Sequence, residues 1–167
     1  YIAKAFEWAH EADPDALLFY NDYNTEFAGR RDKVYKLVKQ LLDAGVPIHG
    51  LGLQGHWNIN NPSEQDLRSA IEKYSLLGLK IQITELDVSV YSSSETNPAD
   101  NVFTAIREQK QLEKYKMVFR VLRDYKSIIT GVTFWNVSDR SSWLDNFPVK
   151  GRKNYPLLRL IIFWITW

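Results

Sequence analysis

Short apolar runs alternate with longer amphipathic stretches along this chain, and this alternation constrains its fold more than any other feature. The runs are Ala16–Tyr20, Ile48–Leu53, Leu79–Val88 and Ile128–Trp135. The first three begin roughly 30 residues apart, which is the size of one βα unit. Their apolar residues stand at consecutive positions, as is typical of parallel strands that are covered on both faces.

Helical periodicity and end signals fill the intervals between these runs. The spacing of apolar residues predicts helices over residues 1–12, 30–44, 63–77 and 100–126. Gly45 and Pro47 are suited to ending the second helix, because glycine tolerates the left-handed cap and proline cannot continue a helix. Ser63 and Asp66 resemble a capping box at the start of the third helix. Tyr1 lies within the first helical pattern, so we expect the natural chain to begin earlier.

Two α/β architectures accommodate this order of elements. One is a doubly wound open sheet, and the other is part of a (β/α)8 barrel. A complete barrel needs about 250 residues, so this chain of 167 residues can supply only half of one.

The composition excludes several classes of protein. The formal net charge is +1 and there are no cysteines, so we expect no nucleic-acid partner, no disulfide framework and no thiolate chemistry. No apolar segment approaches the ~20 residues that span a bilayer, so no membrane partner is expected. The chain does contain six tryptophans, which suit a surface that stacks on flat ligands.

Polar and aromatic residues cluster directly after each expected strand. The clusters are residues 21–26, 54–58, 84–87 and 135–143. Since parallel strands bring their carboxyl ends to one edge of a sheet, we expect these residues to meet there, where such folds bind ligands. Turns alone favour Gly, Asn, Asp and Pro, and do not account for His56, Glu85, Trp57, Trp135 or Trp143.

Glu85 is the most informative single residue. It follows a buried strand, where an unpaired carboxylate is costly. Asp87 lies two residues on, on the same face and roughly 6–7 Å along the strand. His56 from the neighbouring strand is placed to bridge the two acids, which would orient Glu85 as a carboxylate nucleophile. The alternative is a structural ion pair that closes the end of the sheet.

Other chemistries lack their signatures. His49 and His56 would lie roughly 23 Å apart on a straight strand, so they cannot share a metal ion, and no cofactor motif is present. Two acids on one strand cannot flank a bond from both sides, which argues against Glu85 and Asp87 as an inverting pair. Glu26 is interpreted as a hydrogen-bonding loop residue.

Taken together, the strand-end strings resemble glycoside hydrolase family 10, the endo-β-1,4-xylanases. The matching strings are ALLFYNDYN from Ala16, GLGLQGHW from Gly50, ITELDV from Ile83 and GVTFWNVSDRSSW from Gly131. The opening sixteen residues and the late KNYPLL are also similar, so the resemblance covers residues 1–158.

The resemblance implies a fold, a reaction and a set of roles. It implies strands five to eight of a (β/α)8 TIM barrel and retaining hydrolysis of internal bonds in xylan, without a cofactor. Glu85 would be the nucleophile, supported by His56 and Asp87. The residues implied to bind substrate are Gln54, Trp135 and Trp143 near the cleavage subsite, and Tyr23 and Asn24 on the leaving-group side.

Two departures from the family pattern qualify this expectation. The family's general acid/base belongs to an Asn-Glu pair upstream of the first helix here, so we expect this chain alone to be inactive on xylan. Residues 159–167 form an apolar tail that the family lacks. Open strand edges at Ala16–Tyr20 and Ile128–Trp135 favour pairing with the missing N-terminal half or with a second copy.

Three alternatives remain at this stage. One is a non-catalytic sugar-binding half barrel that stacks ligands on Trp57, Trp135 and Trp143. Another is a related β-glucanase. The third is a doubly wound binding domain, in which the strand order reverses and Glu85 has no use.

Overall fold

The computed structural model describes residues 1–97 and 102–157. Its helices are α1 (Ile2–Ala12), α2 (Ala28–Asp43), α3 (Glu64–Ser75) and α4 (Ala105–Asp124), and its strands are β1 (Phe19–Asp22), β2 (Gly50–Leu53), β3 (His56–Asn58), β4 (Lys80–Ser89) and β5 (Ile129–Phe134). Two short 3₁₀ turns follow, η2 (Asp139–Ser141) and η3 (Trp143–Asp145).

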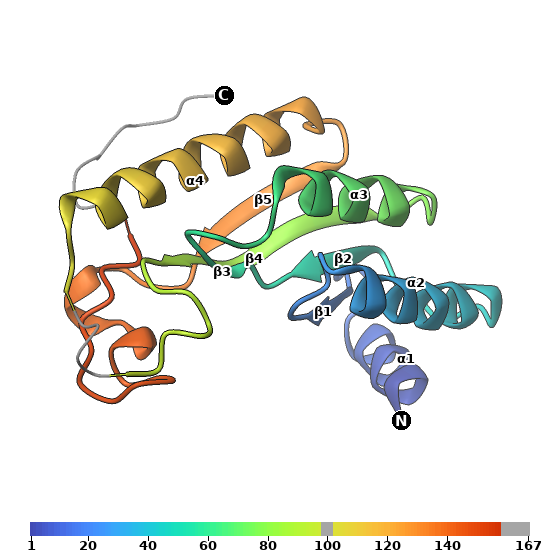
Figure 1. The fold of residues 1–167 in the computed structure, drawn as a ribbon. Coiled ribbons are helices and arrows are strands. Elements are labelled where there is room, and N and C mark those ends of the chain that lie inside the picture. Colours follow the sequence, from blue (N-terminus) through green and yellow to red (C-terminus); the bar gives the residue numbers. More distant parts are fainter. Residues whose placement is uncertain (98–101, 158–167) are drawn as a thin grey trace.

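The strands form one parallel sheet whose long members are paired in chain order. β1 pairs with β2, β2 with β4, and β4 with β5, while the short β3 pairs with the far end of β4. α2, α3 and α4 lie side by side over one face of this sheet, and α1 lies next to β1 (Figure 1). The sequential order matches the expected half barrel, because a doubly wound sheet reverses its strand order and carries helices on both faces.

The hydrophobic core lies between the three helices and the sheet. Each helix contributes residues spaced three or four apart, which places them on one face. The fully or almost fully buried members are Val34, Val38, Leu67, Ile71, Val118, Val121 and Leu122 from the helices, and Leu51, Leu53, Ile81 and Ile83 from the strands. This packing anchors the strands from the helix side and leaves their carboxyl ends free to carry polar groups.

The expected helix ends are confirmed. Gly45, with φ of 77°, and Gly78, with φ of 71°, adopt the left-handed conformation just beyond α2 and α3. Ser63 accepts from the backbone N–H of Asp66, whose side chain accepts from the N–H of Ser63 in return. The capping box therefore forms, with aspartate in the place that glutamate or glutamine more often takes.

Several elements differ from the sequence expectation. The first strand begins at Phe19 and not at Ala16, and Leu17 is 69% exposed, so that part of the apolar run is not a buried strand. Pairing with the second strand starts only where Leu18 O accepts from the N–H groups of His49 and Gly50. The strand β3 was not expected. α4 begins at Ala105, and residues 100 and 101, where it was expected to begin, lie outside the described residues.

The apolar tail, residues 159–167, also lies outside the described residues. Within residues 1–97 and 102–157, no helix combines the length and the hydropathy that crossing a bilayer requires.

Candidate active site

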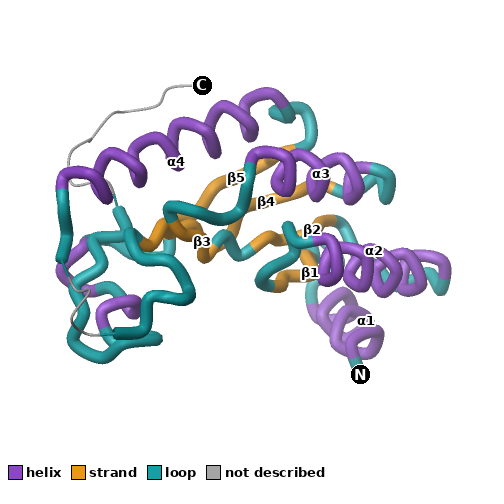
Figure 2. The backbone as a smooth tube through the Cα atoms, viewed as in Figure 1, coloured by secondary structure: helices purple, strands orange, loops and turns teal. Residues whose placement is uncertain are grey.

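The carboxyl ends of the strands meet at one edge of the sheet, where β3 and the loops after β4 and β5 also gather (Figure 2). β4 changes its pairing partner along its length. Its first half pairs with β2 (Gly50–Leu53) and its second half with β3 (His56–Asn58). Glu85 lies between these two paired segments. A break in the register against β5, between Ile83 and Leu86, accompanies it.

His56 lies between the two acids of β4. Its Nε2 is 3.1 Å from Glu85 Oε2 with hydrogen-bond geometry. Its Nδ1 is 3.1 Å from Asp87 Oδ1, an ion-pair contact without hydrogen-bond alignment. His56 and Asp87 are direct neighbours in the β3–β4 register, so main-chain pairing fixes this arrangement. The structure thus brings together the three residues that the sequence analysis grouped.

The protonation of His56 is set by two opposing effects. Burial disfavours the charged imidazolium, but Asp87 and Glu85 outweigh burial and raise the pKa of His56 above its ordinary 6.5. A protonated His56 places one positive charge between the two acids, with Nε2 hydrogen-bonded to Glu85 and Nδ1 facing Asp87.

Asp87 has no exposed surface, and both of its oxygens face partners. Oδ2 accepts a 2.8 Å hydrogen bond from Trp143 Nε1, and Oδ1 faces His56. Asp87 therefore links the orientation of the imidazole to the position of the Trp143 indole.

Two tryptophans stand around His56 with their rings partly exposed. The Trp135 ring centroid lies 5.9 Å and the Trp143 centroid 5.0 Å from the imidazole centroid, both with edge-to-face geometry. Phe147 stacks on Trp143 at 5.4 Å. Trp135 is 50% exposed and Trp143 36%, so both present flat surface to a ligand.

Trp57 does not belong to this surface, which corrects its expected place in a stacking platform. It is 5% exposed and points into the core, where its Nε1 donates to Glu26 Oε1 at 2.9 Å. Glu26 is 1% exposed, and its Oε2 has no hydrogen-bond partner in the structure. Burial raises the pKa of Glu26, although its backbone and the Trp57 N–H partly oppose the rise. Glu26 is thus a hydrogen-bonding loop residue, as the sequence suggested, but it lies buried and not on the rim.

The other implied substrate residues lie at the ends of β1 and β2. Tyr23 is 51% exposed, and the Arg30 guanidinium lies 4.7 Å from its ring centroid. Asn24 is exposed and adopts φ of 55°. Gln54 is half-buried, and its carbonyl accepts a 2.7 Å hydrogen bond from the backbone N–H of Glu85. That bond ties the end of β2 to the residue at the centre of the site.

Asn21 and Thr84 are part of the site although the sequence analysis gave them no role. Asn21 Nδ2 donates to Glu85 Oε1 at 2.9 Å, and Thr84 Oγ1 donates to Asn21 Oδ1 at 2.8 Å. The available signal was position, because Asn21 follows the first apolar run and Thr84 directly precedes Glu85.

The loop after β4 forms another wall of the site. A cavity of about 290 Å³ lies between this loop and the rim, lined by His56, Asp87, Tyr91, Trp143, Phe147 and Arg152 among others. The Tyr91 ring has the guanidinium of Arg152 at 4.1 Å and that of Arg107 at 4.8 Å from its centroid.

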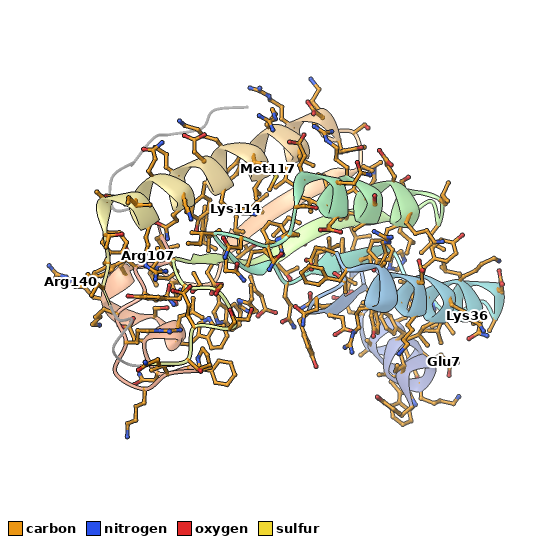
Figure 3. The ribbon with its side chains drawn as sticks, viewed as in Figure 1. Glu7, Lys36, Arg107, Lys114, Met117 and Arg140 are labelled. Atoms are coloured by element: carbon orange, nitrogen blue, oxygen red, sulfur yellow. The ribbon has the colours of Figure 1, made fainter. Side chains whose placement is uncertain are left out.

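Two arginines and one carboxylate hold this loop. Arg107, which Figure 3 labels on α4, pairs with Glu95 and donates to Val90 O, and Arg152 donates to the Glu95 carbonyl. The hydrogen bond from Arg107 is the main cause that lowers the pKa of Glu95 to about 2.

In the described part of the chain, no group of three or more His, Asp or Glu side chains is placed to hold a metal ion. His49, the other histidine considered as a ligand, accepts from the Leu18 N–H through its Nδ1.

Comparisons with known proteins agree with the family resemblance. The model of glycosyl hydrolase family 10 matches residues 1–159. Endo-1,4-beta-xylanase B of Paenibacillus barcinonensis is 50% identical over 158 residues, which are 95% of this chain and 48% of that protein. Beta-1,4-xylanase of Dictyoglomus thermophilum is 52% identical over 157 residues, covering 94% of this chain and 45% of that protein.

Solved structures give the same result. The crystal structure of xylanase XynB from Paenibacillus barcinonensis with a conduramine derivative superimposes with a TM-score of 0.90 at 50% identity, over 93% of this chain and 47% of that one. A mutant structure in complex with xylotriose superimposes with a TM-score of 0.90 at 47% identity, over 94% of this chain and 48% of that one. This chain spans about half the length of the relatives it matches.

Proposed function

This chain belongs to glycosyl hydrolase family 10 and folds as half of a (β/α)8 barrel, and from that premise we propose that it carries the nucleophile half of a retaining endo-1,4-β-xylanase site. The observation that supports this most is the Glu85–His56–Asp87 arrangement, because a carboxylate with both oxygens engaged, by Asn21 and His56, is held in one orientation.

In the proposed reaction, Glu85 attacks the anomeric carbon of a xylosyl unit as the bond to the leaving oxygen breaks. The leaving oxygen takes a proton from a general acid, and a glycosyl-enzyme ester forms on Glu85. Water, deprotonated by the same group acting as base, then hydrolyses the ester and regenerates the carboxylate.

The general acid/base is proposed to come from outside this chain. Retaining hydrolysis needs the two carboxyl groups about 5–5.5 Å apart across the scissile bond. Asp87 cannot take this role, because it lies beside Glu85 on the same strand and is fully buried against His56 and Trp143. We therefore expect the isolated chain to be inactive on xylan.

Substrate contacts are proposed for the exposed rim. Trp135 and Trp143 would pack against the faces of xylose rings at the cleavage subsite, close to Gln54. Tyr23 and Asn24, exposed at the end of β1, would contact the sugar on the leaving-group side.

The open edges of the half barrel are proposed to receive the complementary half. An apolar groove of about 390 Å³ lies between α4 and β5, lined by Phe119, Leu122, Ile129, Val132 and Phe134 among others. Since β5 has a single strand partner, β4, in the described residues, its second edge is available for pairing. A four-stranded N-terminal half would cover both this groove and the open edge of β1.

The test is reconstitution. We would mix this chain with a separately expressed N-terminal half of the Paenibacillus barcinonensis relative and measure reducing sugar released from xylan. Activity is expected only in the mixture, and Glu85→Gln should abolish it, whereas Glu113→Gln on the exposed face of α4 should not. Xylan cleavage by the chain alone would contradict the expected inactivity. Cleavage by the mixture that survives Glu85→Gln would contradict the nucleophile.

A non-catalytic sugar-binding module is the second candidate, favoured by the exposure of Trp135 and Trp143. It predicts binding of xylo-oligosaccharides that survives Glu85→Ala, with no turnover after the complementary half is added. The same reconstitution assay, run on β-glucan and on xylan, distinguishes a β-glucanase from a xylanase.

A further inference from the structure

Asn21 reaches Glu85 across an intervening strand. Asn21 is on β1 and Glu85 is on β4, and β2 lies between them in the sheet. The side-chain amide nevertheless donates to Glu85 Oε1 at 2.9 Å. A contact between strands that are not neighbours requires that the middle strand leave room for it.

Gly52 provides this room. Gly52 is the register partner of Asn21 on β2. A Cβ at Gly52 would lie 2.6 Å from Asn21 Oδ1 and 2.9 Å from Thr84 Cγ2, closer than such atoms approach in proteins. Any other residue there would therefore displace the amide or the threonine. This close approach, and not the backbone conformation, explains why a glycine occupies position 52.

Thr84 stabilises the direction in which the amide points. Because an ionised carboxylate can only accept, the Nδ2 group of Asn21 faces Glu85, and Oδ1 is turned toward Thr84. The Thr84 hydroxyl donates to this Oδ1 at 2.8 Å, with Leu53 O as a longer alternative at 3.4 Å. The carboxylate thus meets a donor and not a repelling oxygen.

A local irregularity in β4 allows two successive residues to reach the same amide. In a regular strand, Thr84 and Glu85 would point to opposite faces. The register against β5 shifts between Ile83 and Leu86, and such irregularities re-aim side chains. Thr84 and Glu85 can therefore both contact Asn21.

We propose that Asn21 is a positioning residue that, together with His56 on the other oxygen, holds the Glu85 carboxylate in one orientation. Thr84 orients the Asn21 amide, and Gly52 leaves the space that the amide needs. The catalytic part of this role rests on the proposed function, in which Glu85 is the nucleophile, whereas the hydrogen bond itself does not.

The first test detects the hydrogen bond without any activity assay. In NMR spectra of the full chain, the Asn21 Nδ2 proton signals should shift when the pH is lowered, because the acceptor of their hydrogen bond is a carboxylate. The response should vanish in Glu85→Gln and weaken in Gly52→Ala. It should persist in Asp22→Asn, the matched control, because the neighbouring Asp22 is paired with Arg30. A response that survives Glu85→Gln, or that disappears only in Asp22→Asn, would overturn the contact.

The second test addresses positioning in the reconstituted mixture. An activated 2-deoxy-2-fluoro xylobioside, whose leaving group needs no acid, should label Glu85. Asn21→Ala and Thr84→Val should slow labelling at saturation about 10-fold or more, with half-saturation unchanged, because misplaced reacting groups lose rate more than binding. Glu113→Gln, on the exposed face of α4, is the control.

The two tests separate the possible failures. Equal labelling rates for the wild-type chain and Asn21→Ala, with the NMR response present, would overturn the positioning role. Absence of labelling in the wild-type mixture would count against the proposed nucleophile, and the NMR titration alone would then decide the contact.

Discussion

Trp143 and Asp87 are joined by a 2.8 Å hydrogen bond from the indole N–H to the buried carboxylate. An aromatic ring on the rim is thereby connected to the residue that faces His56. Moving either one affects the surroundings of His56 and Glu85, so the rim and the Glu85–His56–Asp87 group form one unit.

Trp143→Phe is expected to lower the free energy of unfolding by about 1–3 kcal/mol, the usual cost of leaving a buried acceptor without its donor. Urea denaturation measures this. Trp135→Phe is the control and should change stability by less than about 0.5 kcal/mol, because that ring is half exposed. Equal effects of the two substitutions would contradict a special role for the Trp143–Asp87 bond.

His56 should make stability depend on pH. Its raised folded pKa means that it contributes stability fully below the unfolded value of about 6.5 and that this contribution is lost as pH rises through the folded pKa. The unfolding free energy of the wild-type chain should therefore decline more than that of His56→Gln as the pH rises above about 6.5. Parallel curves for the two proteins between pH 6 and pH 9 would refute this.

Glu26→Gln is expected to stabilise the chain at pH 7 by about 1–3 kcal/mol, because it keeps the acceptor for Trp57 and removes the charge that burial disfavours. A raised folded pKa penalises folding once the unfolded carboxyl ionises above about pH 4.5. The advantage of the glutamine should thus shrink at lower pH, where Glu26 is protonated in both states. Glu113→Gln should show no such trend, and a constant advantage at all pH values would argue against this account.

The open edge of β5 should make the isolated chain associate. Light scattering should show a mass that rises with protein concentration, and Thr133→Lys should reduce the association, because a charge on an edge strand discourages pairing. Thr96→Lys places the same charge on an exposed loop and should leave association unchanged. A monomer at all concentrations would remove the basis for edge pairing.

Periodicity and end signals predicted the order of elements correctly because they are local properties. The apolar stripes of the helices, the glycines after α2 and α3, and the Ser63–Asp66 box each act within a few residues. The proximity of His56, Glu85 and Asp87 was also predictable, since it follows from strand ends meeting at one edge.

The sequence did not reveal features that depend on contacts between distant strands. β3 has three residues and exists because β4 extends beyond the end of β2. Asn21 reaches Glu85 because of a glycine on a third strand. Trp57 resembled a rim residue by position, but strand alternation turns it into the core while His56 faces the site.

The arginine-held loop after β4 has a consequence for behaviour in acid. With a pKa of about 2, Glu95 retains its charge at pH values where ordinary carboxylates are neutral, and its contribution to stability is lost only as pH falls through that value. Arg107 and Arg152 remain cationic throughout. This wall of the candidate site should accordingly stay in place during acidification, after the exposed ion pairs on the helices have broken.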